Sequence, residues 1–85
     1  MTAKEIREKA YALLNLACNN ANQNLVYIEK IENVLGLLSI SNDELCQAQM
    51  YIQKSDTFKT EAMRNGDNLQ VTLGTEAIDW IANYK

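Results

Sequence analysis

Apolar side chains recur at steps of three and four residues along the first part of the chain, which is the spacing of one face of an α-helix. Thr2 and Glu5 form the pattern of a capping box at its start. We therefore predict one long helix over residues 3–38. The alternative is a bend or loop at residues 19–24, because asparagine competes with the helix backbone there. The predicted face consists of Ile6, Ala10, Leu13, Leu14, Ala17, Ala21, Leu25, Ile28, Leu35 and Leu38, interrupted by Glu32.

A second amphipathic segment follows a short turn at residues 39–41. Ser41 and Glu44 repeat the capping-box pattern, and Asn65-Gly66 supplies residues that tolerate the left-handed backbone at a helix end. These signals predict a helix over residues 42–64 that lies antiparallel to the first. Its apolar positions are Leu45, Ala48, Tyr51, Ile52, Phe58, Ala62 and Met63.

The C-terminal part of the chain combines an extended stretch with a short helix. Apolar and polar residues alternate over residues 68–73, which predicts an extended conformation. A lone strand cannot satisfy its own backbone hydrogen bonds, so this stretch should pair with a second copy or lie along the helices. Residues 76–84 are predicted to form a last helix, with an apolar surface made by Ile78, Trp80, Ile81 and Tyr84.

These elements predict an all-α fold in one domain over residues 1–85, built from a long antiparallel helical hairpin and a short C-terminal helix. The second helix, ending near Arg64, reaches back only to about residue 15 of the first. The apolar stripe before that point has nothing opposite it, and such a stripe is not left in water. We expect a homodimer that completes a four-helix core. The alternative is a monomer in which the C-terminal segment, or a bend at residues 19–24, covers the stripe.

Charge and composition exclude several classes of protein. The formal net charge is −3 and the sequence pI is about 4.8, so nucleic-acid phosphates and anionic lipid are not attracted. The chain has neither the pattern of a secretory signal nor an apolar run of about 18 residues, which predicts a cytoplasmic protein without membrane contact. Cys18 and Cys46 are expected to be ordinary reduced side chains.

Catalytic and metal-binding chemistry has little support. The chain has no histidine and only two cysteines, which are too few ligands for a zinc site. The carboxylate pairs Asp43 with Glu44 and Glu29 with Glu32 are acids expected at helix starts and on solvated faces. The three glycines are widely separated, so they form no phosphate-binding loop. We predict that the protein is not an enzyme and holds no cofactor or metal.

Aromatic and apolar residues near the two ends of the chain are the candidates for a binding surface, because Trp and Tyr dominate interface energetics. A group of polar residues falls at similar levels in the predicted hairpin, where it forms either a buried polar layer or a solvated bend. The interface candidates are Ile6, Ala10, Tyr11, Leu13, Leu14, Trp80 and Tyr84, and the polar-layer candidates are Asn20, Asn24, Asp56 and Lys59.

The sequence therefore predicts a small non-enzymatic module that binds another protein, as an accessory, adaptor, chaperone or inhibitor protein does. The alternative is a small regulator that acts on nucleic acid, directly or through a partner, because residues 34–53 can be drawn as helix, turn, helix. The second of those helices begins with Asn42-Asp43-Glu44, where a DNA reader needs donors and positive charge. Repulsion from phosphate disfavours nucleic acid as the partner.

Overall fold

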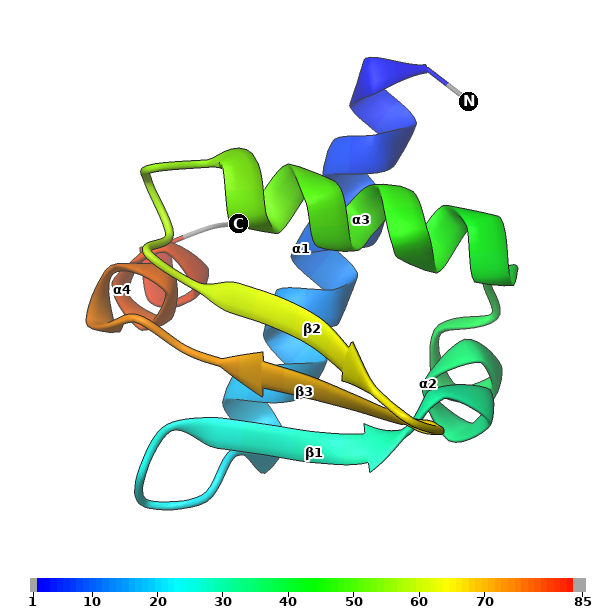
Figure 1. Ribbon diagram of the computed structural model, residues 1–85. Coiled ribbons are helices and arrows are strands. Elements are labelled where there is room, and N and C mark those ends of the chain that lie inside the picture. The colour runs from blue at the N-terminus through cyan, green and yellow to red at the C-terminus, as the bar shows by residue number, and fades with distance from the viewer. Residues whose placement is uncertain (1, 84–85) are drawn as a thin grey trace.

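The computed structural model describes residues 2–83. Over that range the chain forms four helices and a three-stranded antiparallel sheet, so the all-α fold predicted from the sequence is wrong (Figure 1). None of the described helices is both long enough and apolar enough to cross a lipid bilayer. The elements are α1 (Ala3–Asn20), β1 (Val26–Lys30), α2 (Ile31–Leu38), α3 (Asn42–Lys54), β2 (Glu61–Asn65), β3 (Asn68–Thr72) and α4 (Thr75–Asn83).

The single helix predicted over residues 3–38 is wrong, because the chain turns after α1 and continues as β1 and α2. Asn22 makes this turn. Its side-chain oxygen accepts hydrogen bonds from the backbone N–H groups of Asn24 and Val26, at 2.9 and 3.1 Å. Such a local bond offers the backbone an alternative to the helix. The alternative interpretation, a loop at residues 19–24, is closer to the structure.

Asn22→Ala removes this acceptor and is expected to lower the free energy of unfolding by about 1 kcal/mol, because two backbone N–H groups lose a partner that water replaces only in part. Chemical denaturation followed by circular dichroism measures the change. Asn24→Ala is the matched control, because the Asn24 side chain makes no hydrogen bond among the described residues. An equal loss in the two variants would show that the Asn22 side chain does not hold the turn.

The helix predicted over residues 42–64 is also wrong, since α3 ends at Lys54 and the later part of the segment is a strand. The side-chain amides of Gln49 and Gln53 both donate to the carbonyl oxygen of Ala62, at 3.5 and 2.7 Å. These bonds hold β2 against α3. Glutamine side chains thus satisfy a strand backbone that a continued helix would have satisfied internally.

The central strand of the sheet is β3, with β1 and β2 antiparallel on either side of it. The extended stretch predicted over residues 68–73 therefore finds both partners within the chain. The expectation that it pairs with a second copy or lies along the helices is wrong. One level of the sheet consists of Tyr27, Val71 and Ala62 on the buried face, and the next level consists of Ile28, Gln70 and Met63 on the opposite face.

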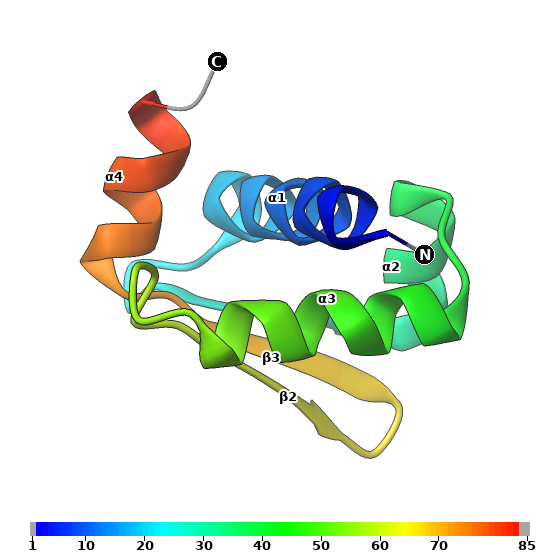
Figure 2. The ribbon, with the colours of Figure 1, turned by 90° about the horizontal axis from the view of Figure 1, so that it is seen from above.

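Helices α1 and α3 lie on the same side of the sheet, and α1 packs against α3, α4 and β1 (Figure 2). Three residues of the stripe that was expected to be uncovered, Ala10, Leu13 and Leu14, are buried in the core of the single chain. The stripe is covered without a second copy. The four-helix core shared by two copies is therefore a wrong prediction.

Both edges of the sheet carry hydrogen bonds from other parts of the chain. On β1, the N–H of Val26 donates to the Asn22 side-chain oxygen, and the carbonyl of Val26 accepts from the N–H of Asn22. Within the same strand, the Glu29 carboxylate accepts from the N–H of Lys30 at 2.8 Å. On β2, the carbonyl of Ala62 is taken by the glutamines of α3. Bonds of this kind at an edge strand discourage the addition of a foreign strand there.

Candidate functional site

Helices α2 and α3 follow one another across a short turn, and the hairpin of β2 and β3 comes after them (Figure 1). The connection turns at Ser39, whose backbone is left-handed with φ 54° and ψ 47°. The hairpin turns at Gly66, whose φ of 63° suits the first central residue of a tight turn. Helix α3 contacts both α1 and β2, so these two elements flank its exposed side.

One side of α3 is buried and the opposite side forms an exposed ridge. Leu45, Ala48 and Ile52 face the core and are fully buried. The outward side carries one negative and one positive charge, with an amide and a thioether between them. We call this set the α3 ridge, and it consists of Asp43, Gln47, Met50 and Lys54.

Arg64 of β2 is fastened along the side of α3 by three hydrogen bonds. Its Nε donates to the Gln49 side chain at 3.0 Å, and its terminal nitrogens donate to the Asn42 side chain at 2.8 Å and to the Cys46 sulfur at 3.1 Å. The contacts tie the hairpin to α3 and fix one positive charge near its first turns. Sequence analysis missed this arrangement, because it placed Arg64 at the end of a helix.

A shallow depression lies between the α3 ridge and α1. Its volume is about 300 Å³. Ile6 is half-buried there, so it is the member of the predicted N-terminal stripe that reaches this side of α3. The depression is lined by Ile6, Gln47, Met50, Tyr51 and Lys54. The α3 ridge and this depression together form what we call the α3 surface.

The capping box predicted at the start of α3 is confirmed. The backbone N–H of Ser41 donates to the Glu44 carboxylate at 2.9 Å, and the backbone N–H of Glu44 donates to the Ser41 hydroxyl at 3.2 Å. The first of these bonds, aided by the nearby charge of Lys9, lowers the pKa of Glu44. The ionised carboxylate therefore stabilises the start of the exposed helix.

Glu44 should make part of the stability dependent on acid pH. Its folded-state pKa lies below the unfolded value, so its contribution is complete above the unfolded pKa and is lost as the pH falls through the folded pKa. We expect Tm to fall less steeply for Glu44→Gln than for the wild type between about pH 5 and 3. Thermal unfolding at several pH values measures this. Glu32→Gln, an exposed acid in the first turn of α2, is the control, and equal slopes for Glu44→Gln and wild type would contradict the expectation.

The aromatic interface candidates Tyr11 and Trp80 meet inside the chain. The Trp80 ring contacts Tyr11 edge-to-face with centroids 5.5 Å apart, and contacts Phe58 in the same manner at 5.0 Å. Aromatic pairs of this geometry stabilise packing beyond the area they bury. They fasten α4 to α1 and to the loop before β2.

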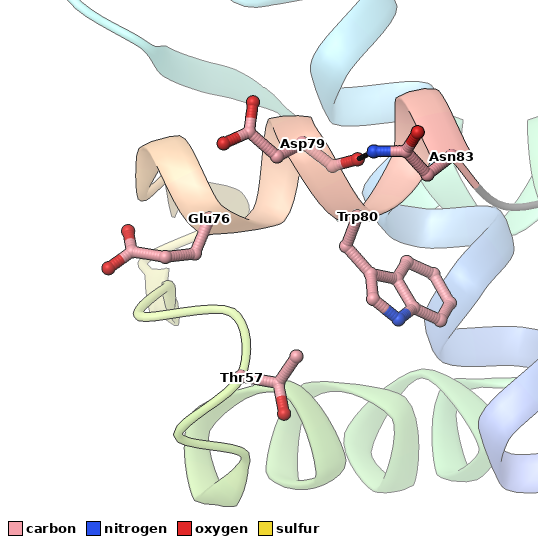
Figure 3. Close-up of a pocket in the computed structure, with 5 residues that line it drawn as sticks. All are labelled: Thr57, Glu76, Asp79, Trp80 and Asn83. Atoms are coloured by element: carbon pink, nitrogen blue, oxygen red, sulfur yellow. Dashed lines mark hydrogen bonds between the residues drawn. The ribbon is translucent and has the colours of Figure 1, made fainter.

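A pocket of about 490 Å³ opens beside Trp80. In Figure 3 the carboxylates of Glu76 and Asp79 point away from the Trp80 indole. The acids and the ring are therefore not combined into a site for a cation. The pocket is lined by Thr57, Glu76, Asp79, Trp80 and Asn83.

The polar-layer candidates do not form a buried layer, because all four are exposed. Asn20 bonds within its own helix, donating to the carbonyl of Leu16 at 2.8 Å. The remaining interface candidate, Tyr84, lies outside the described residues. The polar-layer residues are Asn20 on α1, Asn24 in the turn before β1, and Asp56 and Lys59 in the loop before β2.

The two cysteines are free thiols in different environments. Burial raises the pKa of the Cys18 thiol, whereas Cys46 lies beside the guanidinium of Arg64. Within residues 2–83, His, Cys, Asp and Glu side chains form no group of three that could hold a metal ion. Neither cysteine is therefore part of a metal-ligand group in the described chain.

Comparison of the chain with protein-family models, curated proteins and solved structures gives no match.

Proposed function

We propose that the protein is a small non-enzymatic module that binds another protein through the α3 surface. The order of its elements, with β3 between β1 and β2 and with a hairpin after α2 and α3, is that of a winged helix-turn-helix. In helix-turn-helix proteins the second helix of the pair lies in the major groove of DNA, so its outward face is the part of the fold used for binding. The observation that carries the proposal is an exposed second helix whose Met50, 52% accessible, borders an apolar depression.

The charge near α3 favours a protein partner over nucleic acid. From α2 to the end of β3, residues 31–72 carry three cations, Lys54, Lys59 and Arg64, against six acids. Much of the affinity for DNA comes from Lys and Arg side chains that neutralise phosphates. An excess of acid opposes that attraction, whereas methionine and arginine are enriched in protein interfaces.

Cross-linking at two matched methionines tests the proposal. Met50 on the α3 ridge and Met63 on the outer face of the sheet are 52% and 49% exposed. Each is replaced in turn by a benzophenone amino acid, and the variants are irradiated in cells of the source organism. We expect a defined protein adduct from position 50 and none from position 63. Identical adducts from both positions, or none from position 50, would contradict the proposal.

A second candidate function is recognition of double-stranded DNA, and the placement of Arg64 favours it. Its guanidinium is fixed at the first turns of α3, where helix-turn-helix proteins contact base edges. Fluorescence anisotropy with a labelled DNA duplex at low salt tests this candidate. Saturable binding that is lost in Arg64→Gln would support it over a protein partner.

We further propose that the protein acts in the cytoplasm. Its two cysteines are free thiols, and reducing compartments keep thiols in that state. Thiol labelling of the protein extracted under non-reducing conditions tests the location. Quantitative labelling of both Cys18 and Cys46 is expected, and a mixed disulfide on either would contradict it.

A further inference from the structure

We propose that the partner of the α3 surface is a second copy of this chain, which docks antiparallel to the first along the α3 ridge. This inference rests on the proposed function, because it names the protein that the α3 surface binds. The two copies would be related by a two-fold axis that crosses α3 midway between Gln47 and Met50. Each contact of such an interface occurs twice, so the surface must be complementary to itself.

The order of residues along the α3 ridge meets that requirement. The ridge residues follow one another at steps of four, three and four, which read the same in both directions. Antiparallel docking therefore places Asp43 of one copy opposite Lys54 of the other, at both ends of the interface. Gln47 lies opposite Met50 at its centre. The opposite charges are about 16 Å apart along one helix, at 1.5 Å per residue, so they cannot neutralise each other within one chain.

Both end charges are available for such a contact. Asp43 and Lys54 are exposed, and neither forms an ion pair among the described residues. A parallel arrangement of the two ridges would instead bring like charges together. The charge pattern thus selects the antiparallel arrangement and disfavours the parallel one.

Apolar contact accompanies the charge pairs. Met50 of the second copy lies opposite Gln47, which lines the depression beside α1. Its thioether can enter the depression next to Ile6 and Tyr51, where a flexible methionine adapts to the available space. Met50 and Ile6 of each copy then shield one another from water.

The main alternative route to a dimer, addition of a strand at a sheet edge, is disfavoured by this chain. Asn22 bonds to the backbone of Val26 on β1, and the glutamines of α3 bond to the carbonyl of Ala62 on β2, so part of each edge is already taken. The ridge of α3 has no such cover. The ridge is only about 16 Å long, so it buries less than the roughly 800 Å² per partner of a stable interface, and we expect a weak dimer with a Kd on the order of 100 µM.

Sedimentation equilibrium between about 10 µM and 1 mM protein measures the Kd of the dimer for the wild type and for variants in which the ridge charges are reversed. Asp43→Lys and Lys54→Glu each place like charges opposite one another at both ends, and each is expected to weaken dimerisation at least tenfold. The double variant restores opposite charges and should recover the wild-type Kd within about threefold. Lys59→Glu, an exposed change of the same charge outside the ridge, is the control and should leave Kd unchanged.

Circular dichroism checks that each variant is folded, as we expect for substitutions at exposed positions. A wild-type chain that stays monomeric at 1 mM would overturn the inference, as would a dimer that neither single variant weakens or that the double variant fails to restore. The Met50 cross-link separates this failure from that of the proposed function. An adduct with a different protein leaves the proposed function standing without the dimer, whereas no adduct and no dimer would overturn both.

Discussion

Replacement of Gly74 by alanine is expected to lower the free energy of unfolding by about 3 kcal/mol. A Cβ at this position would lie 2.5 Å from the carbonyl oxygen of Lys59 and 2.7 Å from that of Phe58. Both are backbone atoms, so the clash cannot be relieved by rotating a side chain. The N–H of Gly74 also donates to the Thr60 hydroxyl at 3.1 Å, and any shift of the backbone would weaken that bond. The tight contact joins the loop before β2 to the start of α4.

Gly36→Ala is the matched control for Gly74→Ala. No atom lies within 4 Å of a Cβ added at Gly36, which is exposed in α2. Alanine is favoured over glycine in a helix, so this variant should be more stable by about 0.5–1 kcal/mol. Denaturant unfolding of both variants measures the difference. A loss of less than about 1 kcal/mol for Gly74→Ala would contradict the close approach of the two segments.

Leu14→Ala is expected to lower the free energy of unfolding by about 3–4 kcal/mol. Leu14 is fully buried and belongs to the core cluster, and its helix α1 packs against α3, α4 and β1. The truncation removes apolar area and leaves a cavity that close-packed neighbours fill only in part. A chain of this size has roughly 4–13 kcal/mol of stability in total, so Tm should fall by about 12 °C or more.

Leu37→Ala removes the same atoms from a leucine of α2 that is 62% exposed. Its expected effect is within about 0.5 kcal/mol. Thermal and chemical unfolding of the pair compare a buried and an exposed site with identical chemistry. Similar stabilities for the two variants would show that Leu14 does not lie in the core.

Local signals in the sequence predicted the starts of α1 and α3 correctly. Both capping boxes depend on residues three apart in the chain, and both are present. The alternating residues of β3 and the apolar surface of α4 were also visible as local periodicities. These features require no knowledge of distant contacts.

The two strands beside β3 could not be recognised in the same way. Leu25 and Ile28 continue the helical spacing of the preceding residues, although Val26 to Lys30 pair with β3, some 40 residues later. Likewise Ala62 extends the apolar arc of α3 but faces the core from β2. Short apolar segments fit either a helix or a strand, and the choice is made by tertiary pairing.

The candidate site was predicted only in part. The helix, turn and helix over residues 34–53 were considered as an alternative, and the interface candidate Ile6 lines the depression beside α3. Most of the other interface candidates became core because the strands brought α4 and the sheet onto α1. The position of Arg64 beside Asn42 depends on strand β2, so a prediction that continued α3 as a helix could not find it.

Nuclear magnetic resonance of the ¹⁵N-labelled wild-type chain with a DNA duplex at low salt tests the central claim, that nucleic acid is not the partner of the α3 surface. We predict that the backbone amide signals of α3 and of the hairpin do not shift when an equimolar duplex is added. Progressive, salt-sensitive shifts confined to α3 and the hairpin would contradict the claim, because they would show that nucleic acid occupies the surface assigned to a protein partner.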